Sequence, residues 1–154
     1  MVSRVIPVEP FDLVIFGGTG DLARRKILPG LYRRFHDGQM PEDACVIGAA
    51  RSEMDEADYR DFVRAAIDEF VHKRNDKRVV EAFLERVSYV AVDATGADGW
   101  EALAAKMRPD VVKAYYFSVG PSLFGDIAER LHDYKIADGD ARIVVEKPFG
   151  HDLA

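Results

Sequence analysis

The amino-acid sequence predicts a doubly wound α/β fold, with a mainly parallel sheet between two layers of helices. Three observations support this prediction. Short runs rich in Val, Ile, Tyr and Phe alternate with longer segments in which apolar residues recur every three or four positions. Several of the short runs are apolar on successive residues, which is typical of strands buried on both faces. A glycine-rich segment, 17–20, lies between the first short run and the first helical pattern.

Five strands are predicted, each a short run of β-branched, aromatic or small apolar residues. They are, in chain order, Leu13–Phe16, Cys45–Ala49, Val87–Val92, Lys113–Val119 and Arg142–Glu146. Because a helical pattern lies between each strand and the next, we expect the strands to pair in parallel.

Five helices are predicted from the helical spacing of apolar residues. They are Asp21–His36, Glu56–His72, Arg78–Glu85, Asp98–Met107 and Ser122–Tyr134. Asp21, Asp98 and Ser122 have the side chains expected of N-caps. We expect Pro29 to kink the first helix, because a proline lacks the N–H donor and its ring crowds a carbonyl of the preceding turn.

Length and composition indicate one domain over residues 1–154. A chain with 48% hydrophobic residues can build one sizeable core at this length but not two. The 21 basic and 27 acidic residues give a net charge of −6, so neither nucleic acid nor an anionic membrane is expected as a partner. The single cysteine, Cys45, lies in an apolar run and suits a reducing compartment. No segment resembles a targeting signal or a membrane span, so we expect a cytoplasmic protein.

The glycine-rich segment has the context of a Rossmann-like dinucleotide-binding turn. Gly17, Gly18, Thr19 and Gly20 follow the first strand directly, and Asp21, Leu22 and Ala23 open the helix. Glycines allow the backbone to turn sharply and to approach a pyrophosphate, and the free N–H groups at the helix start attract the anion. The motif can be aligned as Gly18-x-Gly20-x-x-Ala23 or as Gly17-x-x-Gly20-x-x-Ala23, and Gly20 is the close-approach glycine in both. Glycine turns after strands also occur in folds that bind no nucleotide.

Arg24, Arg25 and Lys26 follow in the first turn of the helix, where positive charge opposes the helix dipole. A bound anion would remove that conflict, but a solvated basic face explains the three residues equally well. We therefore do not include them among the expected ligands.

Residues at the end of the second strand indicate NADP rather than NAD. NAD-binding versions of the fold place an acidic residue there to hold the ribose hydroxyls, whereas this chain has Arg51 and Ser52. A guanidinium group suits a 2′-phosphate. One charge-assisted contact of about 1.5–3 kcal/mol would favour NADP roughly ten- to a hundredfold. The alternative is a surface arginine that caps a loop.

The ends of the other strands supply further candidates, because ligands of parallel sheets bind beyond the carboxyl ends of the strands. Asp93 follows the third strand, Ser118–Pro121 the fourth, and Lys147 the fifth. Ordinary turn chemistry is the stronger explanation for Asp93 and Ser118. Lys147 could steady an anionic substrate or a coenzyme group, or it could simply face solvent.

Adjacent residues of a strand face opposite sides of the sheet, so at most one of Tyr115 and Tyr116 can face a given pocket. The four histidines show no ligand-type spacing, and no order of residues indicates a hydrolase, so we expect no metal site and no nucleophile.

Several segments resemble glucose-6-phosphate dehydrogenases. The run Ile15–Lys26, with Leu28 and Pro29, is similar to the opening of that family, and its Gly-Asp-Leu-Ala core is rather specific. Three further segments agree in order and spacing, so the resemblance spans nearly the whole chain. They are Gly48–Ser52, Tyr115–Phe117 and Ile143–Gly150.

The resemblance implies an NADP-dependent enzyme that oxidises glucose 6-phosphate to 6-phosphogluconolactone, the first step of the pentose phosphate pathway. By position it implies that Gly17, Gly20, Asp21 and Leu22 line the pyrophosphate turn and that Arg51 holds the 2′-phosphate. It also implies that Lys147 contacts substrate and coenzyme and that Pro148 is a cis-proline. Tyr116 and the Asp93-Ala94 turn are weaker assignments. Full-length members of the family are expected to be homo-oligomers.

The family segment of the type R-I-D-H-Y-L-G-K-E, which supplies the histidine base, has no counterpart here. A sugar oxidation needs a base to remove the hydroxyl proton. We therefore expect the catalytic domain to be absent from this chain, and the chain alone to bind coenzyme without catalysis.

Three alternatives remain at this stage. A short-chain or epimerase-type dehydrogenase would need a Tyr-x-x-x-Lys pair, which the sequence lacks. A receiver-type phosphoacceptor module would need an acidic pair at the end of the first strand, where Phe16 and Gly17 stand. A regulatory domain that senses NADP without chemistry would need only residues that are already present.

Overall fold

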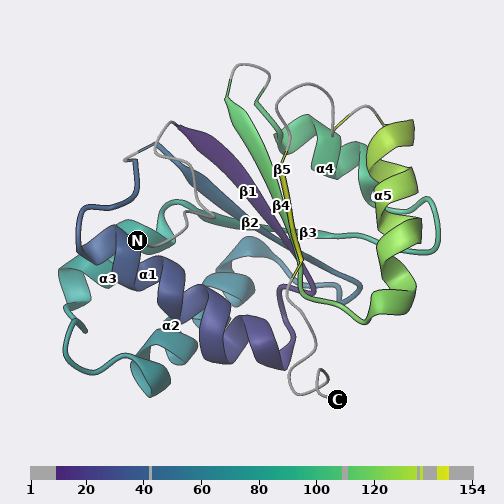
Figure 1. Ribbon diagram of the computed structural model, residues 1–154. Helices are drawn as coiled ribbons and strands as arrows, with labels where there is room; N and C mark the ends of the chain where they lie inside the picture. Colours follow the sequence, from purple (N-terminus) through teal and green to yellow (C-terminus); the bar gives the residue numbers. More distant parts are fainter. Residues whose placement is uncertain (1–9, 42, 109–110, 135, 137–141, 146–154) are drawn as a thin grey trace, which may run out of the picture.

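The protein forms a five-stranded parallel sheet with helices on both faces (Figure 1). The computed structural model describes residues 10–41, 43–108, 111–134, 136 and 142–145. The strands are β1 (Phe11–Phe16), β2 (Cys45–Ala50), β3 (Val87–Ala91), β4 (Val112–Phe117) and β5 (Arg142–Val145). Their order is β3-β2-β1-β4-β5, and every neighbouring pair is parallel. The predicted fold class is therefore confirmed.

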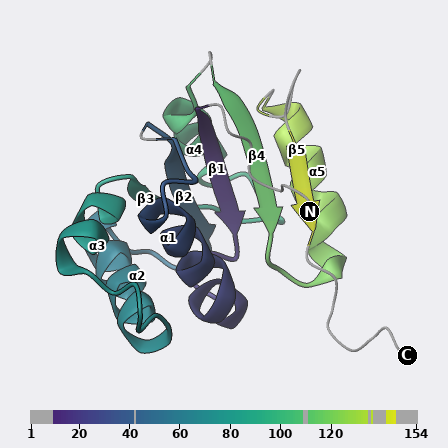
Figure 2. The same ribbon diagram turned by 60° about the vertical axis from the view of Figure 1, so that its left-hand side comes forward.

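The chain changes direction across the sheet at β1. From β1 it moves to β2 and β3 on one side, and it then crosses back to place β4 and β5 on the other. Figure 2 shows β1 beside β4 with both arrowheads pointing the same way. Phe16, the last residue of β1, pairs with Ala49 and with Phe117. Ligands of such sheets bind at this reversal point, beyond the carboxyl ends of the strands.

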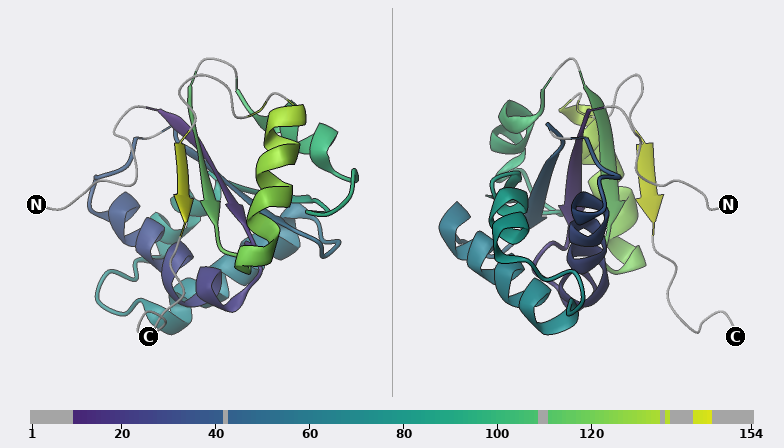
Figure 3. Two further views of the ribbon diagram at one scale, coloured as in Figure 1. Left: turned by 45° about the vertical axis from the view of Figure 1, so that its right-hand side comes forward. Right: turned by 90° about the vertical axis from the view of Figure 1, so that its left-hand side faces the viewer.

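The helices divide between the two faces of the sheet (Figures 1 and 3). Their bounds are η1 (Ala23–Ile27), α1 (Leu28–His36), α2 (Glu56–Phe70), α3 (Lys77–Leu84), α4 (Trp100–Lys106), η2 (Pro121–Leu123) and α5 (Phe124–Asp133). One core lies between the sheet and η1, α1, α2 and α3, and a second lies between the sheet and α4 and α5. Alternate residues of β1 enter each core: Leu13 and Ile15 the first, Val14 and Phe16 the second. All six residues of β1 are buried, which explains its continuous apolar run.

The first helix is continuous, but its second turn is wider than an α-helix. The helix starts at Asp21, and 23–27 has π-helical hydrogen bonding before α1. The N–H of Leu28 donates to the carbonyl of Ala23, five residues earlier. Pro29 follows at once, and because it has no N–H to offer the carbonyl of Arg25, the wider turn accommodates it. We expected a kink at Pro29, and the structure shows a π-helical turn directly before it in a continuous helix.

All three expected N-caps are wrong. Asp21 is already helical, and its carboxylate binds Arg24 and Arg25. Helix α4 begins one residue later than Asp98 would allow, after Gly99 at φ 89°, and Ser122 lies inside the short helix η2.

The side-chain caps are instead Asp55 and Asp76. Asp55 accepts a hydrogen bond from the N–H of Asp58 at 2.8 Å and begins α2. Asp76 accepts one from the N–H of Arg78 at 3.0 Å and begins α3.

An ion pair between a buried aspartate and a half-buried arginine closes the amino edge of the sheet, opposite the glycine turn. Asp12, in β1, is 1% exposed. Its carboxylate accepts hydrogen bonds from the backbone N–H of Arg108 at 2.7 Å and from the guanidinium Nε at 2.9 Å. The same guanidinium also donates to the carbonyls of Phe11 and Asp43. Arg108 therefore ties the segment after α4 to the starts of β1 and β2.

Among the residues that the structure describes, no helix combines the length and apolarity required to cross a bilayer.

Candidate functional site

The glycine turn leaves β1 at the reversal point of the sheet. Gly17 adopts φ 85°, a left-handed conformation that favours glycine. A Cβ atom on Gly17 would lie 2.2 Å from the carbonyl oxygen of Ser118, which follows β4. The N–H of Gly17 donates to the carbonyl of Ala49 at 2.8 Å. The turn is therefore fixed to the strands on both sides of β1.

Gly18 packs inward. A Cβ atom there would lie 2.9 Å from the Cα of Gly48 in β2 and 2.9 Å from the hydroxyl oxygen of Tyr59 in α2. The Tyr59 hydroxyl donates to the carbonyl of Gly18 at 2.9 Å. This glycine therefore allows close packing of the turn on β2 and α2.

Gly20 is exposed and open. A Cβ atom there would meet only the carbonyl oxygen of Gly17, at 3.2 Å. Its carbonyl accepts the first helical hydrogen bond, from the N–H of Arg24 at 3.0 Å. The N–H groups of Asp21, Leu22 and Ala23 therefore belong to the first turn, where an α-helix has no partners of its own for them.

Together these positions favour the alignment Gly17-x-x-Gly20-x-x-Ala23. Gly17 makes the sharp turn, Gly20 leaves space for a ligand beside the helix start, and the fully buried Ala23 packs the helix on the sheet. A backbone turn with free N–H groups at a helix N-terminus can hold a phosphate or pyrophosphate.

The basic residues after the turn have partners within the protein. Arg24 donates to the carboxylate of Glu69 at 2.7 Å, and both Arg24 and Arg25 contact that of Asp21. Their guanidinium groups also lie over the ring of Phe70, at 5.1 and 5.9 Å from its centre. Contacts within the first helix and with α2 thus explain the positions of these two arginine side chains without a bound anion. The side chain of Asp21 remains 70% exposed beside the helix start.

Arg51 and Ser52 follow β2 directly and are both exposed. The hydroxyl of Tyr89, in β3, lies 2.6 Å from the carbonyl oxygen of Ser52 and 3.2 Å from that of Ala50. The backbone is therefore held on both sides of Arg51, while the Arg51 side chain is left at the surface. Arg51 is two residues beyond Ala49, the residue whose carbonyl holds the glycine turn.

The carboxylate of Asp93 is engaged in its own turn. It accepts hydrogen bonds from the N–H and the hydroxyl of Thr95, both at 3.1 Å. The Asp93 carbonyl accepts from the indole N–H of Trp100 at 2.9 Å, and Ala94 packs against the core under α4 and α5. This arrangement supports turn chemistry for Asp93, the explanation favoured from the sequence.

The two tyrosines of β4 face opposite sides of the sheet, as expected. Tyr115 is fully buried under α5 and donates to the carbonyl of Ile136. Tyr116 is half-buried on the other face and pairs with Ile15 of β1. The Ser118 hydroxyl just beyond β4 is buried and has no hydrogen-bond partner among the described residues. Lys147 and Pro148 lie outside the described residues, so the roles expected of them stay predictions.

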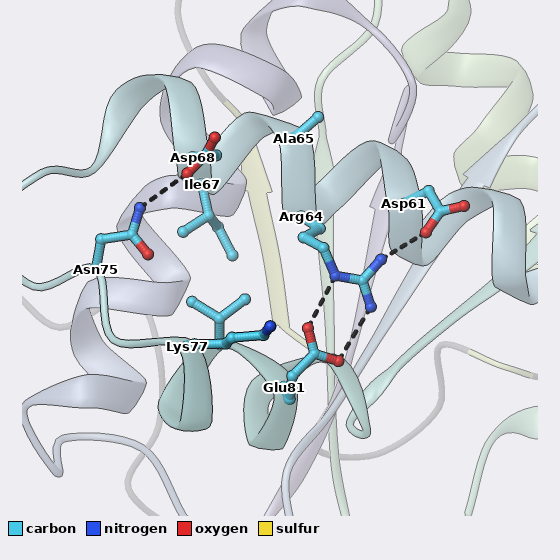
Figure 4. A pocket seen from close by; sticks show the side chains of 9 residues that line it. Asp61, Arg64, Ala65, Ile67, Asp68, Asn75, Lys77 and Glu81 are labelled. Carbon is cyan, nitrogen blue, oxygen red and sulfur yellow. Dashed lines mark hydrogen bonds and ion pairs between the residues drawn. The ribbon is translucent and has the colours of Figure 1, made fainter.

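A hollow of about 620 Å³ lies elsewhere, between α2 and α3 (Figure 4). It is lined from those helices and the loop between them, and by none of the residues expected to bind coenzyme. The Arg64 guanidinium, which crosses it, is already bound to the carboxylates of Glu81 and Asp61. The charges of Arg64, Asp61 and Glu81 in this hollow are thus paired with one another.

Three residues support the two candidate segments from beneath, a role that was not predicted from the sequence: Gly48, Tyr59 and Tyr89. One signal was available. A glycine inside an otherwise apolar strand marks the close approach of another group, and a Cβ on Gly48 would lie 2.3 Å from the ring of Tyr59. Nothing in the sequence could indicate which carbonyls the two tyrosine hydroxyls would reach.

Comparison with known proteins agrees with this geometry. The family model described as "Glucose-6-phosphate dehydrogenase, NAD binding domain" matches residues 14–154. A glucose-6-phosphate 1-dehydrogenase of Rhizobium meliloti is 46% identical over 157 residues, which covers 100% of this chain and 32% of that protein. The crystal structure of the enzyme from Mycobacterium avium matches with a TM-score of 0.83 at 35% identity, covering 96% of this chain and 32% of that one.

A further structure is described as glucose-6-phosphate dehydrogenase in complex with its substrate glucose-6-phosphate. It matches with a TM-score of 0.79 at 29% identity, covering 99% of this chain and 33% of that one. The chain spans about a third of the length of the curated relatives it matches. Since the family model matches nearly all of the sequence, the chain belongs to the glucose-6-phosphate dehydrogenase family, in the part that forms its NAD binding domain.

Proposed function

We propose that this chain binds NADP⁺ and is the coenzyme domain of an enzyme that oxidises glucose 6-phosphate to 6-phosphogluconolactone. The observation that carries the proposal is the open glycine turn at the reversal point of the sheet, where Gly20 leaves space at a helix start. The names of the relatives support the sugar substrate. Family membership sets aside the short-chain dehydrogenase and the receiver module.

The residues present fit a dinucleotide. The pyrophosphate would lie against Gly20 and the N–H groups of the first helical turn, and Thr19, Asp21 and Leu22 border the same turn. Arg51 and Ser52 would hold the 2′-phosphate. Asp93, Ala94, Tyr116 and Lys147 remain further candidates for coenzyme contact, and Lys147 for substrate contact. The bound nicotinamide would accept a hydride from the sugar.

Catalysis, assembly and location extend the proposal to the whole enzyme. The chain covers about a third of its relatives, and we place the histidine base in the remainder of the enzyme, so the isolated chain would bind coenzyme without turnover. Homo-oligomer formation by the full-length enzyme, a cytoplasmic location and the lack of a nucleic-acid partner are part of the same proposal.

The first test is the coenzyme preference and its dependence on Arg51. Calorimetric titration with NADP⁺ and with NAD⁺, at one ionic strength, is expected to show tighter binding of NADP⁺. Arg51→Ala should weaken NADP⁺ binding about ten- to a hundredfold and leave NAD⁺ binding nearly unchanged, because only NADP⁺ has the 2′-phosphate.

Arg64→Ala is the matched control, because it removes an arginine from the hollow between α2 and α3. It should leave both affinities unchanged. If neither nucleotide binds to the folded chain, the proposed function is wrong. If Arg64→Ala weakens binding and Arg51→Ala does not, the nucleotide site is the hollow.

The second test separates binding from folding at Gly20. A methyl group there would meet only one backbone atom, yet it would stand where the pyrophosphate approaches. Gly20→Ala should therefore weaken both NADP⁺ and NAD⁺ binding by about tenfold or more, or about 1.4 kcal/mol, with little change in the urea unfolding midpoint.

Gly30→Ala provides the control for Gly20→Ala, because Gly30 lies inside α1 and a Cβ there would meet nothing within 4 Å. It should raise the free energy of unfolding by about 0.5–1 kcal/mol, since alanine is the better helix former, and bind both nucleotides normally. Unchanged affinity in Gly20→Ala would remove the glycine turn from the site.

A further inference from the structure

Two buried tyrosines lie under the two segments that we assign to the coenzyme. Tyr59 comes from α2 and Tyr89 from β3, and both belong to the core that covers one face of the sheet. Tyr59 is fully buried and Tyr89 is 5% exposed. Their rings are in contact, with centres 5.0 Å apart and planes tilted by 33°. The pair therefore forms one aromatic unit beneath the carboxyl edge of β2.

Each hydroxyl donates a hydrogen bond to the backbone of a different segment. The Tyr59 hydroxyl donates to Gly18, inside the glycine turn, at 2.9 Å. The Tyr89 hydroxyl shares its one proton between the carbonyls of Ser52 and Ala50, one on each side of Arg51. A buried tyrosine hydroxyl needs a partner, and all three partner carbonyls here belong to or border segments expected to hold phosphate groups.

The surrounding residues make room for these contacts. A Cβ on Gly48 would lie 2.3 Å from the Cζ of Tyr59, and one on Gly18 would lie 2.9 Å from its hydroxyl oxygen. Burial raises the pKa of Tyr59, and it also raises the pKa of Tyr89. Both hydroxyls therefore remain protonated donors at neutral pH.

We propose that Tyr59 and Tyr89 are positioning residues for the coenzyme, with separate tasks. Tyr59 fixes the glycine turn that would hold the pyrophosphate, a group that NADP⁺ and NAD⁺ share. Tyr89 fixes the backbone on both sides of Arg51, and so presents the guanidinium to the 2′-phosphate, which NADP⁺ alone carries. This inference rests on the proposed function, and it adds which buried groups set the strength and the selectivity of binding.

The test replaces each tyrosine with phenylalanine, which keeps the ring and removes the hydroxyl. Tyr89→Phe should weaken NADP⁺ binding about three- to tenfold and leave NAD⁺ binding unchanged, since ordering Arg51 then costs conformational entropy. Tyr59→Phe should weaken both nucleotides by a similar factor. A purely structural role would not produce this difference, because a loss of core stability affects both nucleotides equally.

Tyr32→Phe is the matched control. Tyr32 is also fully buried, and its hydroxyl also donates to a backbone carbonyl, that of Arg74, but this contact involves none of the segments assigned to the coenzyme. The variant should bind both nucleotides with wild-type affinity. Circular dichroism verifies the fold of each variant, and if Tyr59→Phe does not fold, Tyr89→Phe alone decides the selectivity.

The outcomes are distinguishable. If the wild-type chain binds neither nucleotide, the proposed function is wrong and this inference falls with it. If the wild-type chain prefers NADP⁺ but Tyr89→Phe retains the full preference, or weakens both nucleotides equally, the inference alone is overturned.

Discussion

Arg108→Ala is expected to lower the free energy of unfolding by about 3 kcal/mol, because the carboxylate of Asp12 stays buried and loses its charged partner, keeping only the backbone N–H of that residue. Asp12 is 1% exposed, and it receives both a backbone and a side-chain hydrogen bond from Arg108. Burial tends to lower the pKa of Arg108, but the hydrogen bond and the charge of Asp12 outweigh it, and the pKa is raised. Equilibrium urea unfolding would measure the loss.

Arg64→Ala is the control for this prediction as well. Arg64 also binds two carboxylates, Glu81 and Asp61, but these groups are exposed at the surface, and exposed ion pairs contribute little. Arg64→Ala should therefore lower the free energy of unfolding by much less than Arg108→Ala. Equal losses for the two variants would show that burial of Asp12 is not what makes the Arg108 contact important.

Gly17→Ala is expected to destabilise the protein by roughly 2–5 kcal/mol, from two separate causes. An alanine at φ 85° costs about 1–2 kcal/mol of backbone strain. Its methyl group would also overlap the carbonyl of Ser118, and displacing that backbone costs about 1–3 kcal/mol more. Ser118 cannot move freely, because its N–H donates to the carbonyl of Phe16 at 2.9 Å.

Gly38→Ala isolates the first cause. Gly38 has φ 74° in the turn after α1, and a Cβ there would meet nothing within 4 Å. This variant should show only the strain, about 1–2 kcal/mol, so the difference between the two variants measures the overlap with Ser118. If both lose the same stability in thermal and urea unfolding, the contact between the glycine turn and β4 does not limit substitution at Gly17.

The fold could be predicted because its signals are local. Buried parallel strands produce continuous apolar runs, and the five predicted strands agree with the structure to within two residues at each end that the structure describes. The first residues of the helices were harder to predict than the strands. Asp21, Asp98 and Ser122 have the right side chains for caps, but none of them caps a helix. Helix α4 begins after Gly99, which has a left-handed backbone conformation and no side-chain cap.

The candidate site could be predicted only for residues whose position follows from their place next to a strand in the sequence. The glycine turn and Arg51 each follow a strand directly, so spacing along the sequence was sufficient to place them. Arg24 has a partner on α2, and Tyr89 on β3 holds the backbone on each side of Arg51. Both contacts depend on how distant segments pack, which no local pattern records. This is why the basic run looked like a possible anion site, whereas the supporting tyrosines were not recognised.

The buried indole of Trp100 gives the protein an intrinsic optical probe. It is the single tryptophan of the sequence, it is fully buried, and its ring lies 5.6 Å from that of Phe16, the residue before the glycine turn. Its N–H donates to the carbonyl of Asp93. One fluorophore is therefore in contact with the strand end that leads into the turn and with the loop after β3. Its emission can report unfolding, and the changes that ligands cause at this edge of the sheet, without any label.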